Sequence, residues 1–162
     1  MQLLLVRHAI AAERGRAWPD DGLRPLTPEG RDRMKDIAAG LAKLVEPGLI
    51  LSSPLVRAMQ TAQILADAWP RARLRDCEAL AWGDTPALLG ELASADMDVV
   101  AAVGHEPHCS RSLSYLLSGS HAAVRTTFKK GAAALVSFPG AARAGDGTLE
   151  WLLQPRTLRL LA

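Results

Sequence analysis

The chain has 162 residues, of which 49% are hydrophobic and 22% charged, and its formal net charge at pH 7 is +2. This length suits one compact domain, and we expect residues 1–162 to form one. The charges are scattered, without a basic arm or stripe that would indicate a nucleic-acid partner, and no apolar stretch is long enough to cross a membrane. Cys77 and Cys109 are far apart and outside any metal-ligand spacing, which favours free thiols and a cytoplasmic location.

Short apolar runs alternate with segments of helical periodicity along the chain. The predicted elements are, in chain order, a strand at 3–6, a loop at 9–26, a helix from Thr27 to Pro47-Gly48, a strand at 49–51, a helix from Val56 to before Pro70, a helix starting at Thr85-Pro86, a strand at 99–103, a helix ending near Gly119, and strands at 134–138 and 149–153. This alternation predicts an α/β domain with a mainly parallel, helix-covered sheet. The last two strands are separated by a Gly-rich turn and could form a hairpin, which would make the sheet mixed.

Three of the predicted strands each end in a polar cluster. The clusters are Arg7-His8, Ser52-Ser53-Pro54 with Arg57, and Gly104-His105-Glu106. In open α/β sheets, ligands bind beyond the carboxyl ends of the strands. If these strands are parallel neighbours, two histidines and two arginines meet in one crevice.

Two imidazoles beside two guanidiniums indicate phosphoryl chemistry. Arginine keeps its charge and presents a planar fork that matches phosphate oxygens, and Ser53 could add a phosphate contact. The neutral imidazole of His8 can attack phosphorus and so divide one displacement into two easier steps. This chemistry requires no cofactor and no metal. A metal site made of His8 and His105 would need acidic ligands near the strand ends, where the arginines would repel a cation.

The motifs around these clusters resemble the histidine phosphatase superfamily, and its small SixA-type branch of phosphohistidine phosphatases most of all. The resemblance covers nearly the whole chain, with its elements in the family's order: Leu5-Val6-Arg7-His8-Ala9, Arg24-Pro25-Leu26-Thr27-Pro28-Glu29-Gly30, Ser52-Ser53-Pro54-Leu55-Val56-Arg57-Ala58 with Thr61-Ala62, Gly104-His105-Glu106-Pro107 and Phe128-Lys129-Lys130-Gly131-Ala132. It implies a three-layer α/β/α fold of the phosphoglycerate mutase-like type. Ala9 departs from the family's usual glycine, a change that is common in the small branch.

The resemblance also implies the roles of individual residues. His8 would be the phosphorylated nucleophile, with Arg7, Arg57 and His105 around the phosphoryl group, and Arg24 matches a position that reaches the pocket in small members. Larger members carry a glutamate proton donor before a Gly-rich turn, and this chain has no clear equivalent. Glu78 and Asp84 lie in the matching region, and either could serve.

Together with these residues, the resemblance implies a phosphatase that acts on phosphohistidine of a protein through a phosphohistidine intermediate. The short stretch between Arg57 and Thr85 leaves little room for the lid of a mutase, and an open pocket would suit a protein-borne phosphate. Two alternatives stay open. One is a phosphatase of small phosphomonoesters, and the other is a non-catalytic module that binds a phosphorylated ligand with the same arginines.

Overall fold

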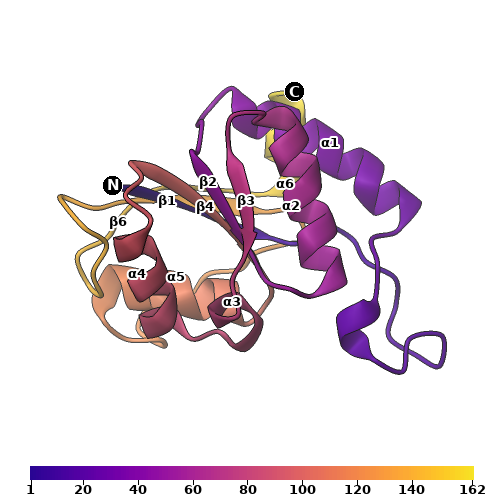
Figure 1. Cartoon of the computed structure of the whole chain (residues 1–162), viewed down its shortest axis with the longest axis horizontal. Coiled ribbons are helices and arrows are strands. Elements are labelled where there is room, and N and C mark those ends of the chain that lie inside the picture. The colour runs from indigo at the N-terminus through magenta and orange to yellow at the C-terminus, as the bar shows by residue number, and fades with distance from the viewer.

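The computed structural model describes residues 1–162 and is built on one six-stranded sheet (Figure 1). The strands lie in the order β3-β2-β4-β1-β5-β6, and their bounds are β1 Gln2–Arg7, β2 Leu49–Ser52, β3 Arg73–Asp76, β4 Val99–Gly104, β5 Ala133–Ser137 and β6 Thr148–Leu153. Strands β1 to β4 pair in parallel, whereas β5 and β6 pair antiparallel with their neighbours. The predicted mixed, mostly parallel sheet is therefore confirmed.

Helices cover both faces of the sheet, which gives the predicted three layers (Figure 1). The helices are η1 Asp21–Leu23, α1 Pro28–Ala42, α2 Val56–Ala68, α3 Ala79–Trp82, α4 Thr85–Ser94, α5 His108–Ser118 and α6 Pro155–Leu160. Alternate residues of β1 point to opposite faces because the side-chain period of a strand is two. Leu4 and Val6 pack with α1, α2 and α6, whereas Leu3 and Leu5 pack with α3, α4 and α5.

The start of α1 is anchored on the loop that follows β1. Thr27 is the N-cap, with its Oγ1 accepting a hydrogen bond from the backbone N–H of Gly30 at 2.9 Å, as the sequence predicted. Gly30 lies so close to this loop that a Cβ there would stand 2.0 Å from the carbonyl oxygen of Ile10. The backbone N–H of Thr27 donates to the same oxygen at 3.0 Å. The two contacts hold the residues just beyond His8 in place.

Elements without a strong apolar pattern were not predicted. Strand β3 has the sequence Arg-Leu-Arg-Asp and is mostly exposed, as expected of an edge strand, so no apolar run marks it. The helices η1, α3 and α6 have three, four and six residues, which is too short for a periodic pattern. Helix α4 is capped by Asp84, whose carboxylate accepts from the N–H of Ala87, and not by Thr85, because Thr85 instead bonds Ser112 inside the protein.

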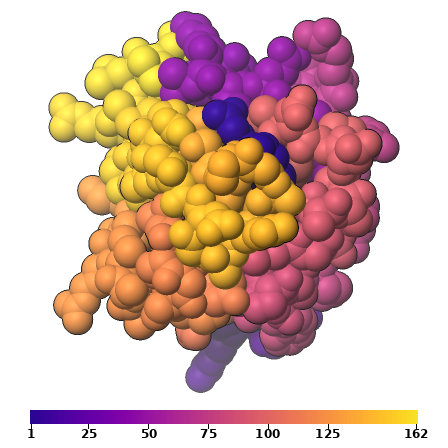
Figure 2. Space-filling view, turned by 90° about the vertical axis from the view of Figure 1, so that its left-hand side faces the viewer, coloured from indigo at the N-terminus to yellow at the C-terminus, as the bar shows by residue number.

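The amino-terminal end of β1 lies at the end of the sheet opposite to the polar clusters. Figure 2 shows this side, where the first residues, in indigo, reach the surface beside the segment near residue 140. The N-terminal ammonium of Met1 donates to the carbonyl oxygens of Phe138 and Gly140 at 3.2 and 3.1 Å. No helix of the chain combines the length and the apolar character needed to cross a membrane.

Candidate active site

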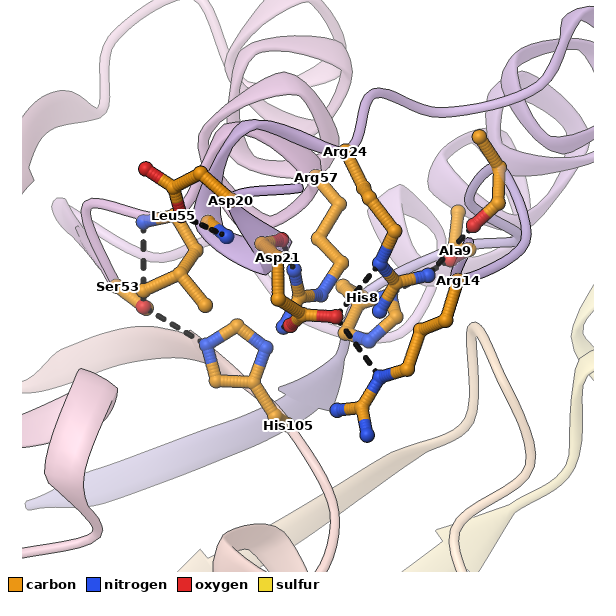
Figure 3. Close-up of polar contacts among 12 residues, drawn as sticks. His8, Ala9, Arg14, Asp20, Asp21, Arg24, Ser53, Leu55, Arg57 and His105 are labelled. Carbon is orange, nitrogen blue, oxygen red and sulfur yellow. Dashed lines mark hydrogen bonds and ion pairs between the residues drawn. The ribbon is translucent and has the colours of Figure 1, made fainter. Parts of the chain in front are cut away.

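The register of the sheet brings the three polar clusters together. Arg7 of β1 lies opposite Gly104 of β4, and Ser52 of β2 lies opposite Val103, so the three strands end at the same level. Pairing continues one residue further, because the N–H of His8 donates to the carbonyl of Gly104 at 2.9 Å and that of Ser53 donates to the carbonyl of Val103 at 3.0 Å. The three strand ends meet as predicted, and Figure 3 shows His8, Ser53, Arg57 and His105 close to one another.

His8 is held with one ring nitrogen free. Its ring is buried, and Nδ1 lies 2.7 Å from the carbonyl oxygen of Ala9. A carbonyl oxygen only accepts, so Nδ1 carries the hydrogen and a neutral ring keeps its lone pair on Nε2. The ring of His105 lies alongside, with the ring centroids 5.3 Å apart.

Both histidines are neutral at physiological pH. Burial lowers the pKa of His8 to about 3; the hydrogen bond to Ala9 opposes this shift, and the charges of His105, Arg57 and Arg7 add to it. Burial also lowers the pKa of His105 to about 4, with the positive charge of Arg57 as the next cause. A neutral His8 is the form that can attack phosphorus.

Two arginines lie beside His8 with their guanidinium groups fixed by backbone oxygens. Arg7 donates from Nη1 to the carbonyl of Phe128 at 2.6 Å, and Arg57 donates from Nη1 to the carbonyl of Asp21 at 2.7 Å. The Nε atoms of Arg7 and Arg57 are both buried and have no hydrogen-bond partner in the protein. These unused donors next to a nucleophile fit an anionic ligand with several oxygens.

The carboxylate of Asp21 joins three arginines at the outer side of this crevice (Figure 3). Its Oδ1 lies 2.8 Å from Nε of Arg14 and 2.8 Å from Nε of Arg24, and its Oδ2 lies 3.1 Å from Nη2 of Arg57. Partial burial raises the pKa of Asp21, but the hydrogen bond from Arg24 and the charges of the arginines outweigh it and leave this pKa below its ordinary value. Asp21 is therefore ionised at neutral pH.

Ser53 supports His105. Its Oγ lies 2.8 Å from Nε2 of His105 and accepts a hydrogen bond from the N–H of Leu55 at 3.4 Å, just before α2. Nδ1 of His105 is buried without a partner, and His105 is one of the residues that line a cavity of about 10 Å³ on the α3–α5 side of the sheet. Such a cavity has room for about one water molecule.

The structure gives the candidate acids different surroundings. Glu78 is exposed, and Asp84 caps α4; neither forms a hydrogen bond or ion pair with a residue around His8. Glu106 holds the loop before β5, since its carboxylate accepts from the N–H of Phe128 at 3.0 Å and from the hydroxyl of Ser110 at 2.7 Å. No group of three or more His, Cys, Asp or Glu side chains is arranged to hold a metal ion.

Sequence reasoning missed two residues of the site, namely Asp21 and Arg14, and it included Thr61 in a motif without giving it a role. Thr61 is fully buried one turn after Arg57; it accepts from the N–H of Ala9 at 3.1 Å and donates to the carbonyl of Arg57 at 2.7 Å. Its place in the motif, four residues after Arg57 on one helix, was the signal that pointed to it.

Comparison with known proteins gives evidence about the family of this chain that is independent of the site geometry. Residues 3–87 match the family model described as "Histidine phosphatase superfamily (branch 1)". An uncharacterised protein of Picosynechococcus sp. is 42% identical over 116 residues, which cover 66% of this chain and 67% of that protein.

Solved structures share the fold over almost the whole chain. The structure of the protein histidine phosphatase SixA complexed with tungstate is similar with a TM-score of 0.80 and 25% identity, covering 98% of this chain and 99% of the other. An alpha-ribazole phosphatase of Shigella flexneri has a TM-score of 0.73 over 96% of this chain and 97% of its own, but at 16% identity that likeness concerns the fold alone.

Proposed function

The chain belongs to the histidine phosphatase superfamily, in its SixA-like branch, and from this premise we propose that it dephosphorylates phosphohistidine on a protein. It is a phosphatase of the histidine-nucleophile type. The observation that carries the proposal is the state of His8: its Nδ1 is bonded to the carbonyl of Ala9, and its pKa is lowered to about 3. Nε2 therefore carries a free lone pair, and it lies beside the buried Nε–H groups of Arg7 and Arg57, which have no hydrogen-bond partner.

In the proposed first step, Nε2 of His8 attacks the phosphorus atom of the substrate. A P–N bond to His8 forms while the bond to the leaving group breaks, and the leaving imidazole keeps the electron pair and takes a proton from water. Arg7, Arg57 and Arg24 neutralise the oxygens of the phosphoryl group, and His105, whose Nε2 is bonded to Ser53, donates a hydrogen bond from Nδ1 to the same group. Water then attacks phosphorus, which releases phosphate and restores His8.

A phosphohistidine substrate suits the surroundings of the candidate acids. Transfer from one imidazole to another exchanges one P–N bond for another, so the free energy changes little in the first step. An alkoxide leaving group would need a strong proton donor, whereas an imidazole needs little help. Neither Glu78 nor Asp84 forms a hydrogen bond with the residues around His8. An imidazole leaving group can depart without an acid in that place.

The proposed substrate is a phosphorylated protein and not a nucleic acid or a membrane component. The short α3, which is too small to form a lid, and the likeness to a protein histidine phosphatase favour a protein-borne phosphate. We also propose a cytoplasmic location, because Cys77 and Cys109 are both free and buried, as expected in a reducing compartment.

The test is phosphate release from a phosphotransfer protein that carries phosphohistidine, with wild type and His8→Ala compared. We expect release by wild type alone. If both proteins are inactive there but wild type hydrolyses an aryl phosphate, the substrate is a small phosphomonoester. If wild type hydrolyses neither substrate, the site is a binding module and the proposal is wrong.

A further inference from the structure

The arginines that the proposed function assigns to phosphate are already engaged by a carboxylate of the same chain. Arg57 donates from Nη1 to the backbone oxygen of Asp21 and lies with Nη2 3.1 Å from its carboxylate. Arg24 lies with Nε 2.8 Å from the same carboxylate. Carboxylate and phosphate oxygens bind the guanidinium fork in the same way, so Asp21 stands where an oxyanion would compete.

The segment that carries Asp21 is weakly attached to the rest of the protein. Asp21 opens η1, a single turn of which no residue is buried, and the neighbouring Leu23 is 56% exposed. Arg14, the third partner, has a side chain that is 78% exposed and forms no other ion pair. Moving η1 outward would therefore uncover little apolar surface, and its main cost would be the loss of the Asp21 contacts.

We propose that Asp21 is a specificity-determining residue: its carboxylate competes with phosphate for Arg24 and Arg57, and so disfavours free phosphate and small phosphorylated molecules relative to a phosphoryl group on a protein. A small oxyanion has only the pocket contacts with which to displace Asp21. A phosphorylated protein adds contacts outside the pocket, and that additional binding energy can drive the displacement. This inference rests on the proposed function for its substrate class.

The alternative is that Asp21 is a positioning residue, which holds Arg24 and Arg57 in the geometry for binding phosphate. The two roles predict opposite signs for a neutral substitution. If Asp21 competes, Asp21→Asn removes a negative charge from the pocket and strengthens phosphate binding. If Asp21 positions the arginines, the same variant weakens phosphate binding.

The chain offers a matched control in the adjacent residue. Asp20 has the same charge and precedes the same turn, where its Oδ1 accepts from the N–H of Gly22 at 2.8 Å, but it forms no ion pair with an arginine. Asp20→Asn therefore reports the effect of one lost surface charge and of a changed η1. Asp21→Ala serves as a second variant, and far-UV circular dichroism with urea unfolding checks that each protein is folded.

The experiment is calorimetric titration of inorganic phosphate into wild type, Asp20→Asn, Asp21→Asn and Asp21→Ala at pH 7. We expect both Asp21 variants to bind phosphate at least about tenfold more tightly than wild type, the effect of freeing one charge-assisted contact, and Asp20→Asn to match wild type. Unchanged or weaker binding in the folded Asp21 variants would overturn the proposal, as would an equal gain in Asp20→Asn. Binding is measured without turnover, so a failure of the phosphohistidine assay would count against the proposed function and leave the competition itself standing.

Discussion

The hydroxyl of Thr61 joins the loop that follows His8 to the helix that carries Arg57, and its removal should cost both stability and activity. Thr61→Val replaces the hydroxyl by a methyl group of similar size. The variant leaves the buried N–H of Ala9 without its acceptor at 3.1 Å and removes the bond to the carbonyl of Arg57 at 2.7 Å. An unpaired buried donor costs about 1–3 kcal/mol, so we expect the free energy of unfolding to fall by about 2 kcal/mol.

Activity should fall as well, because the carbonyl of Ala9 fixes the ring of His8. A small displacement of the nucleophile should lower kcat/KM by about tenfold, since reaction rates depend steeply on alignment. The assays are urea unfolding and hydrolysis of an aryl phosphate. Thr61→Ser is the control, because it keeps the hydroxyl and loses one methyl group, at a cost of about 1 kcal/mol. The reasoning is wrong if Thr61→Val matches Thr61→Ser in both assays.

Three further predictions concern charge and protonation. The pKa values of His8 and His105 in the folded protein, about 3 and about 4, lie below their unfolded value of 6.5, so the unfolded state binds more protons in the range between. The free energy of unfolding should therefore fall by about 1.4 kcal/mol per histidine for each pH unit between pH 6.5 and about pH 4. Urea unfolding at pH 7 and pH 5 measures this, and equal stabilities would contradict it. Arg57→Lys should raise KM for an aryl phosphate about tenfold, because a point charge replaces a fork; an unchanged KM would place phosphate elsewhere. With an alkyl phosphate as substrate, Glu78→Gln or Asp84→Asn should lower kcat at least about tenfold, and full activity in both variants would show that the proton donor is another group.

The sheet and the inner part of the site could be predicted because they depend on buried strands. The apolar runs of β1, β2 and β4 are readable in the sequence, and once they pair in parallel, Arg7, His8 and His105 must lie at one edge. Strand β3 could not be predicted, because an exposed edge strand with three charged residues has no apolar pattern.

The outer part of the site could not be predicted, because it depends on how a loop folds. Asp20 and Asp21 are adjacent acids in a charged loop, and no local pattern shows which of them faces the arginines. Only the fold of residues 9–26 places Asp21 between Arg24 and Arg57 and turns Asp20 to cap η1.

The central claim is that His8 becomes phosphorylated during turnover, and trapping that intermediate tests it most directly. Wild type and His8→Ala would be mixed with a phosphohistidine-bearing protein, quenched within the first turnover in alkali, where phosphohistidine survives, and digested for mass spectrometry. We predict one phosphoryl group on the peptide that contains His8 in wild type and none on the corresponding peptide of His8→Ala. Phosphate release by wild type with no phosphorylated His8, or with the phosphoryl group on His105, would contradict the account.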